Sequence, residues 1–72
     1  METQTTLSVR LNGAVVATAP GTTLGGLLDA RGVERRMIAV EHNREILPRR
    51  LWDETVLNDG DELEIVTMVG GG

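Results

Sequence analysis

The fold is decided by the stretch TLSVRLNGAVVAT, residues 6–18. Over residues 7–11 apolar and polar side chains alternate, which is typical of a strand with one buried face. The next two residues, Asn12-Gly13, favour the positive φ angles of a tight hairpin turn. Residues 14–18 therefore predict a second strand that returns antiparallel to the first.

One amphipathic helix is expected after this hairpin. Either Thr22 or Thr23 can act as the N-cap residue, whose side-chain oxygen accepts a hydrogen bond from the first turn. Arg31 in the last turn and Gly32 just after it are good signals for the helix end. Three leucines at positions i, i+3 and i+4 predict the face that packs on the sheet: Leu24, Leu27 and Leu28.

Two adjacent glycines, Gly25 and Gly26, lie inside this expected helix. Each costs about 1 kcal/mol relative to alanine, so they need a reason. We expect them to let the helix lie close to the sheet. A phosphate-binding role is disfavoured, because the chain has neither a Gly-x-Gly-x-x-Gly turn nor a Gly-Lys-Ser/Thr segment.

The second half of the chain predicts two further strands before the last one. Residues 37–41 alternate in polarity, and residues 45–47 form a short strand that Pro48 ends or confines to a sheet edge. Between them, His42 is expected to be an exposed turn residue. Residues 58–61, NDGD, predict a structural turn.

The last strand is expected over residues 62–69, and its apolar character indicates a central position in the sheet. Leu63 and Ile65 should face the helix. Val66 and Met68 then alternate to the outer face, where apolar side chains need an explanation. Partner docking is one explanation, and ordinary burial within a central strand is the other.

Together these elements predict an α+β fold, a ubiquitin-like β-grasp roll with a mixed sheet packed on one main helix. In such a roll the last strand lies parallel to the first at the centre of the sheet. We expect residues 1–72 to form a single domain with a flexible C-terminal glycine tail, residues 70–72.

Composition disfavours several function classes. The net charge is −4 and Trp52 is the only aromatic residue, which argues against nucleic-acid binding. The chain has no cysteine and one histidine, so a metal site is not expected. It has neither an apolar stretch of about 20 residues nor a signal peptide, so we expect a cytoplasmic protein. Residues 37–72 hold three arginines and eight acids, for which a basic partner groove is the natural complement.

Three segments in the second half of the chain form a recognisable set. They are ILPR at residues 46–49 followed by Trp52, TVLNDGD at residues 55–61, and the diglycine at residues 71–72, to which Gly70 adds a third glycine. With these segments the chain resembles the thiamine-biosynthesis sulfur carrier family (ThiS) over nearly its whole length. The diglycine alone is common to all ubiquitin-like modifiers and carriers, so the Pro-Arg and Trp segment favours this family.

The resemblance implies a carrier protein rather than an enzyme. An adenylating enzyme (ThiF-like) would consume ATP to activate the carboxyl group of Gly72, and a persulfide sulfur donor would convert it to a thiocarboxylate. A thiazole synthase (ThiG-like) would then accept the sulfur. Gly70 and Gly71 would complete the slim tail, and Val66 and Met68 would dock the partners. The carrier itself would bind no cofactor and would be a monomer.

Three other interpretations stay open. The small subunit of molybdopterin synthase shares the fold and the thiocarboxylate chemistry but serves a different acceptor. A ubiquitin-like protein modifier would instead be joined to lysines of other proteins and would give adducts of higher mass. A regulatory or RNA-contacting β-grasp module is disfavoured by the acidic charge.

Overall fold

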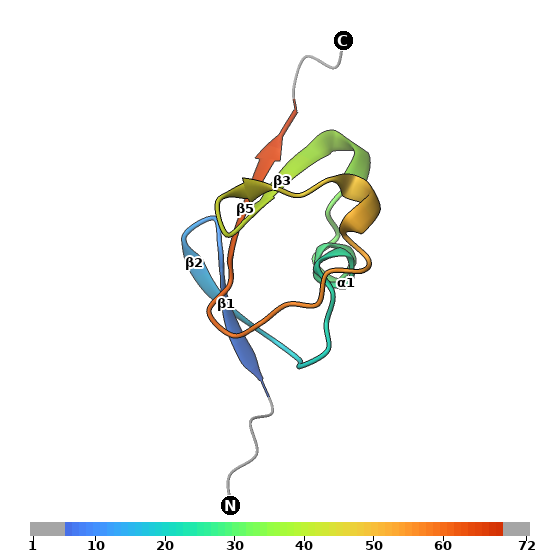
Figure 1. Cartoon of the computed structure of the whole chain (residues 1–72). Helices are drawn as coiled ribbons and strands as arrows, with labels where there is room; N and C mark the ends of the chain where they lie inside the picture. Colours follow the sequence, from blue (N-terminus) through green and yellow to red (C-terminus); the bar gives the residue numbers. More distant parts are fainter. Residues whose placement is uncertain (1–5, 69–72) are drawn as a thin grey trace, which may run out of the picture.

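The computed structural model describes residues 6–68 (Figure 1). Its α-helix, α1, spans Leu24–Ala30, and two short 3-10 helices follow, η1 (Arg35–Met37) and η2 (Arg49–Leu51). The strands within this range are β1 (Leu7–Leu11), β2 (Ala14–Thr18), β3 (Ile38–His42), β4 (Glu45–Ile46) and β5 (Glu62–Thr67).

The strands form one mixed sheet in the order β2-β1-β5-β3-β4. The central strand β5 is parallel to β1 and antiparallel to β3, and α1 covers one face of the sheet (Figure 1). The short β4 ends before Pro48 and lies at an edge, as predicted. This arrangement confirms the predicted β-grasp roll.

Local sequence signals place the hairpin and the helix ends. In the first hairpin, Asn12 and Gly13 adopt φ angles of 51° and 86°, the positive values that the turn requires. Thr23 is the N-cap of α1, and its hydroxyl oxygen accepts a hydrogen bond from the N–H of Gly26. The helix ends one residue before Arg31, which is therefore the C-cap rather than part of the last turn.

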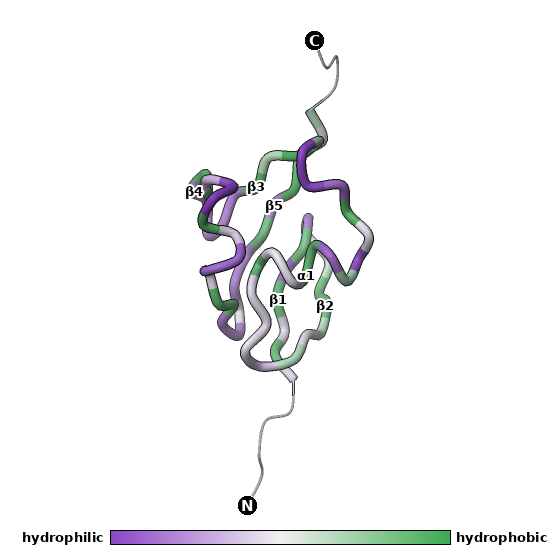
Figure 2. Tube along the Cα trace, turned by 90° about the vertical axis from the view of Figure 1, so that its right-hand side faces the viewer, coloured by the Kyte–Doolittle hydropathy of each residue, from purple (hydrophilic) through white to green (hydrophobic). Residues whose placement is uncertain are grey.

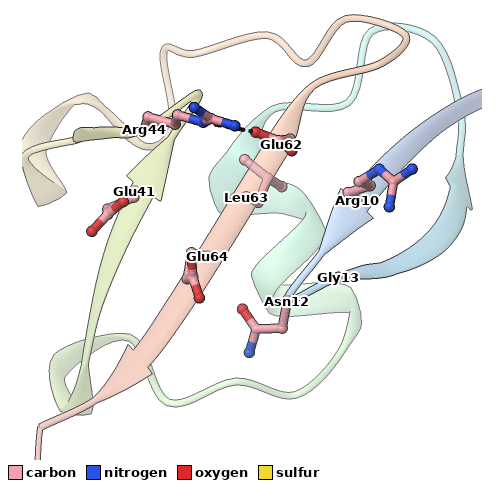
Figure 3. Close-up of a pocket in the computed structure, with 8 residues that line it drawn as sticks. All are labelled: Arg10, Asn12, Gly13, Glu41, Arg44, Glu62, Leu63 and Glu64. Carbon is pink, nitrogen blue, oxygen red and sulfur yellow. Dashed lines mark ion pairs between the residues drawn. The ribbon is translucent and has the colours of Figure 1, made fainter.

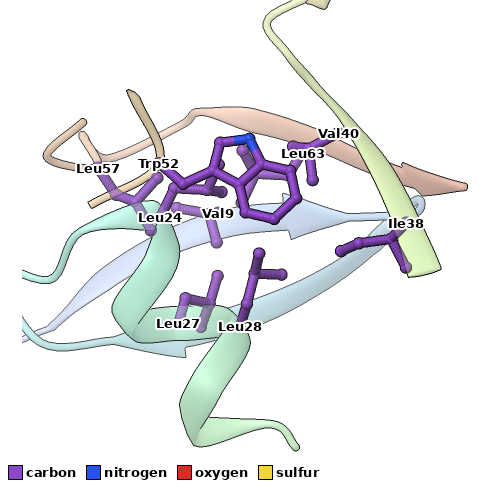
Figure 4. Close-up of a cluster of buried hydrophobic side chains, with 9 residues drawn as sticks. All are labelled: Val9, Leu24, Leu27, Leu28, Ile38, Val40, Trp52, Leu57 and Leu63. Carbon is purple, nitrogen blue, oxygen red and sulfur yellow. The ribbon is translucent and has the colours of Figure 1, made fainter. Parts of the chain in front are cut away.

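The core consists of aliphatic side chains around the single tryptophan. Trp52 is 1% exposed, and its indole N–H donates a hydrogen bond to the carbonyl of Leu47 at 2.9 Å. The three leucines of α1 are buried, as predicted, and Trp52 is thus a core residue. Figure 4 shows the whole cluster: Val9, Leu24, Leu27, Leu28, Ile38, Val40, Trp52, Leu57 and Leu63.

The two helix glycines do not bring α1 close to the sheet, so that prediction is wrong. A Cβ atom on Gly26 would lie nearest to the hydroxyl oxygen of Thr23. The N–H of Gly25 donates to the carbonyl of Trp52 at 2.9 Å, and a Cβ atom there would overlap the carboxylate of Asp53. Asp53 accepts two hydrogen bonds from Arg35, which hold its pKa below the usual value. Gly25 therefore leaves room for an ion pair outside the sheet.

His42 is not an exposed turn residue, so that prediction is also wrong. It is the last residue of β3, and its Nε2 atom lies 3.0 Å from Oδ2 of Asp61. Asp61 is 7% exposed and also accepts hydrogen bonds from the side-chain amide of Asn43 and the backbone N–H of Asn58. This cluster joins the β3–β4 turn to the turn that precedes β5.

We expect Asp61→Asn to destabilise the protein at neutral pH by about 1–3 kcal/mol. Burial acts to raise the pKa of Asp61, but its hydrogen bonds from Asn58, His42 and Asn43 outweigh burial and hold the pKa below its ordinary value. The carboxylate therefore contributes its full stabilisation above the unfolded-state pKa, and this contribution disappears as pH falls through the lower folded-state pKa. Urea denaturation at pH 7 and pH 3 measures both effects.

Asp59→Asn is the matched control for this measurement. The Asp59 carboxylate also caps a backbone N–H, that of Ser8 at 2.7 Å, but it lies in an exposed part of the same turn. The Asp61 variant should lose less stability between pH 7 and pH 3 than the wild type. An unchanged loss of stability in acid would show that Asp61 does not stabilise the fold as a carboxylate.

Candidate functional site

The predicted sulfur-carrying residue Gly72 and the tail residues Gly70 and Gly71 lie outside residues 6–68, which the structure describes. The predictions about them stay predictions. The described part of the site consists of the strand that leads to this tail and the surface around the end of that strand.

The central strand β5 leads directly to the tail. At its end the N–H of Met68 donates a hydrogen bond to the carbonyl of Met37, at 2.7 Å. The pair Ile38–Thr67 closes the β3–β5 register just before this bond. The sheet thus holds the chain in place up to Met68, and β5 ends at the side of the molecule opposite the start of β1 (Figures 1 and 2).

The two faces of β5 are assigned as predicted. Leu63 is buried and Ile65 packs against the core, whereas Val66 is 52% exposed and Met68 is 45% exposed. A central strand does not bury these two side chains, so ordinary burial no longer explains them. Their role in docking a partner stays a prediction.

A further exposed apolar residue, Met37, lies beside them and was missed in the sequence. Met37 is 43% exposed, and its carbonyl accepts the hydrogen bond from the N–H of Met68. Ala39 is the register partner of Val66. We define the apolar patch as Met37, Ala39, Val66 and Met68. Only the β3–β5 register brings Met37 and Ala39 beside Val66 and Met68, so the sequence pattern gave no signal for these two residues.

An open hollow of about 390 Å³ lies on the same sheet next to the apolar patch, and its lining includes three glutamates (Figure 3). Glu62 forms an ion pair with Arg44 at 3.6 Å. Glu41 and Glu64 are directly opposite in the β3–β5 register, and neither forms an ion pair within residues 6–68. Like charges at directly opposed positions destabilise a sheet. A cation from a partner would relieve this repulsion.

Other kinds of site find no support in the described part of the chain. Residues 6–68 contain no cluster of three or more His, Asp or Glu side chains that could hold a metal ion. Within the same range, no helix is long and apolar enough to cross a membrane.

Comparison with known proteins gives one consistent family. The family model that matches the chain is the ThiS family, over residues 9–72. The sulfur carrier protein ThiS of Bacillus subtilis (strain 168) is 38% identical over 65 residues, which cover 89% of this chain and 98% of that protein.

A solved structure and a longer relative agree with this match. The crystal structure of a thiamine biosynthesis protein (ThiS) from Geobacter metallireducens superposes with a TM-score of 0.80, at 32% identity, and covers 92% of this chain and 100% of that one. A thiazole synthase of Paramagnetospirillum magneticum is 42% identical over 62 residues, which are 86% of this chain and 19% of that protein. The chain therefore spans about a fifth of that relative's length. With the β-grasp fold and a family match that includes the glycine tail, the chain belongs to the ThiS family of sulfur carrier proteins in thiamine biosynthesis.

Proposed function

We propose that this chain carries sulfur as a thiocarboxylate on Gly72 and delivers it for thiazole formation. The observation that carries the proposal is the family match over residues 9–72, which includes the glycine tail. The central strand β5 supports it, because its pairing with β3 continues up to the start of the tail and gives a firm base for a tail that must enter a partner's active site.

The chemistry follows from the properties of a terminal carboxyl group. With a reference pKa of about 3.3–3.7, the carboxyl group of a chain-terminal Gly72 is ionised at neutral pH and is a poor electrophile. Attack of this carboxylate on the α-phosphate of ATP gives an acyl adenylate and releases pyrophosphate. The terminal sulfur of a donor persulfide then displaces AMP. A thiol cleaves the resulting acyl disulfide, which leaves the thiocarboxylate on Gly72 and a disulfide on the donor side.

All catalytic groups in this scheme belong to the partners. An adenylating enzyme binds and consumes ATP, a persulfide donor supplies sulfur, and a thiazole synthase accepts it, all in the cytoplasm. The carrier acts as a monomer and binds no cofactor. The relative called thiazole synthase, one fifth of which matches this chain, supports an association with that enzyme.

The proposal predicts that Gly72 gains sulfur in exchange for oxygen. Incubation of the 72-residue chain with an adenylating enzyme, ATP and a sulfur source should give an intact-mass increase equal to one sulfur minus one oxygen. Fragmentation should place the increase on Gly72, and a sample without ATP is the control. A gain at another residue, or none with a competent enzyme, would contradict the proposal.

Two further observations separate the alternatives. A protein modifier would give a ladder of higher-mass adducts on immunoblots of intact cells. A small subunit of molybdopterin synthase would form the same thiocarboxylate but transfer its sulfur to a pterin precursor rather than to thiazole synthase. The acceptor thus decides between the two carriers.

We further propose that the apolar patch docks the adenylating enzyme. Its exposed methionines and valine lie at the end of β5, where the tail begins. An enzyme that binds this patch is therefore close to the tail. The opposed carboxylates Glu41 and Glu64 lie along the same strands and favour a basic partner surface.

We expect Met68→Asp to weaken binding to the adenylating enzyme by more than about 1 kcal/mol, because a charge would be buried in an apolar contact. Titration calorimetry and circular dichroism measure affinity and fold. Val56→Asp is the matched control, since Val56 is 51% exposed but lies in the loop before β5. Added salt should slow association, because it screens the charges that steer the encounter. Binding that is unaffected by Met68→Asp and by salt would contradict the docking proposal.

A further inference from the structure

The main-chain groups of β5 alternate between its two neighbouring strands. Met68 directs its N–H to the β3 side, where it donates to the carbonyl of Met37. Both main-chain groups of one strand residue point to the same side, and those of the next residue point to the other side. Leu63, Ile65 and Thr67 therefore direct their N–H and C=O groups to the β1 side. The three residues are successive rungs of a ladder on that side.

The strand β1 is too short to fill this ladder. The carbonyl of Leu63 accepts a hydrogen bond from the N–H of Asn12 at 2.9 Å. At Ile65 the side chain of Asn12 makes the hydrogen bonds that a neighbouring strand would make. Its Oδ1 accepts from the N–H of Ile65 at 2.7 Å, and its Nδ2 donates to the carbonyl of Ile65 at 3.2 Å. Figure 3 shows Asn12 beside β5, which continues past the end of β1. Asn12 thus closes the ladder at Ile65.

Thr67 is the next rung, and its main chain has no partner there. Among residues 6–68 its N–H and C=O form no hydrogen bond, and the residue is exposed. A strand edge with free N–H and C=O groups is a template on which another extended chain can add. This edge is in line with β1 and adjoins the apolar patch.

We propose that an extended segment of the adenylating enzyme pairs with Thr67 as an added strand, in the position that a longer β1 would occupy. This inference rests on the proposed function, because that enzyme must take hold of the tail. Five residues lie beyond Thr67, and their greatest reach is about 16–18 Å. A strand pairing at Thr67 would fix the direction in which this short tail leaves the domain without requiring bulky side chains near Gly72.

The test removes the N–H of Thr67, and the ester also makes the carbonyl of Val66, which faces β3, a weaker hydrogen-bond acceptor. A chemically synthesised full chain with an ester in place of the amide N–H of Thr67 should bind the adenylating enzyme roughly three- to tenfold more weakly. Its melting temperature should fall less than that of an ester at Met68, because the N–H of Thr67 has no partner within residues 6–68. Thr67→Ala keeps the main-chain donor and should retain wild-type affinity. An ester at Met68 removes the bond to Met37 and should lower the melting temperature.

Two results would overturn the inference. One is an unchanged affinity of the Thr67 ester for the enzyme. The other is a loss of thermal stability as large as that of the Met68 ester, because the N–H of Thr67 would then be used within the chain. The intact-mass assay of Gly72 on the wild-type chain runs in parallel. If the thiocarboxylate forms and the Thr67 ester binds normally, strand pairing fails while the proposed function stands.

Discussion

Deletion of Gly71 and Gly72 is expected to abolish adenylation completely and to leave the melting temperature nearly unchanged. Adenylation should fail because the shortened chain ends before the partner's active site. Stability should be kept because a glycine has no side chain to bury, and the core cluster is built from residues between Val9 and Leu63. Pyrophosphate release measures the first effect, and circular dichroism during heating measures the second.

Substitutions at Gly71 separate the effect of tail length from the effect of side-chain size. Gly71→Val keeps the length but adds a branched side chain and restricts φ and ψ, so it should also block adenylation. Gly71→Ala adds one methyl group and should have a smaller effect. A large fall in melting temperature on deletion would show instead that the tail packs against the domain and stabilises it.

Sequence signals that act between near neighbours predicted the fold well. The Asn12-Gly13 turn and the three leucines of α1 lie where the sequence places them, and the helix cap is Thr23, one of the two threonines predicted. Each of these features depends only on residues within about one helical turn or one hairpin. The exposure of Val66 and Met68 followed from simple alternation along β5. These features need no knowledge of distant contacts.

Contacts between distant segments account for the errors. His42 looked like an exposed turn residue because its partner, Asp61, lies 19 residues further along the chain. Gly25 looked like a sheet contact because the Asp53 carboxylate it accommodates belongs to another segment. At the candidate site, the exposed Met37 and the hydrogen bonds of the Asn12 side chain to Ile65 were missed for the same reason, since strand register alone brings them to β5.

Trp52→Ala is expected to have the largest effect on stability of any single substitution considered. Truncation of a fully buried tryptophan costs about 3–5 kcal/mol. A domain of this size has a total stability of about 4–11 kcal/mol at 0.05–0.15 kcal/mol per residue, so a large part of it would be lost. Trp52 packs at the centre of the core, with its indole N–H bonded to Leu47. Urea denaturation followed by far-UV circular dichroism measures the loss, because the variant has no tryptophan fluorescence.

Trp52→Phe separates the core role of this residue from a docking role. Phenylalanine keeps most of the apolar surface but leaves the Leu47 carbonyl without its indole donor, so we expect a loss of about 1–3 kcal/mol. Because only 1% of Trp52 is exposed, a partner that docks on the apolar patch cannot contact it without a rearrangement. The folded Trp52→Phe variant should therefore bind the adenylating enzyme like the wild type, whereas Met68→Asp should not. Weaker binding by folded Trp52→Phe would mean that the tryptophan leaves the core when the partner binds.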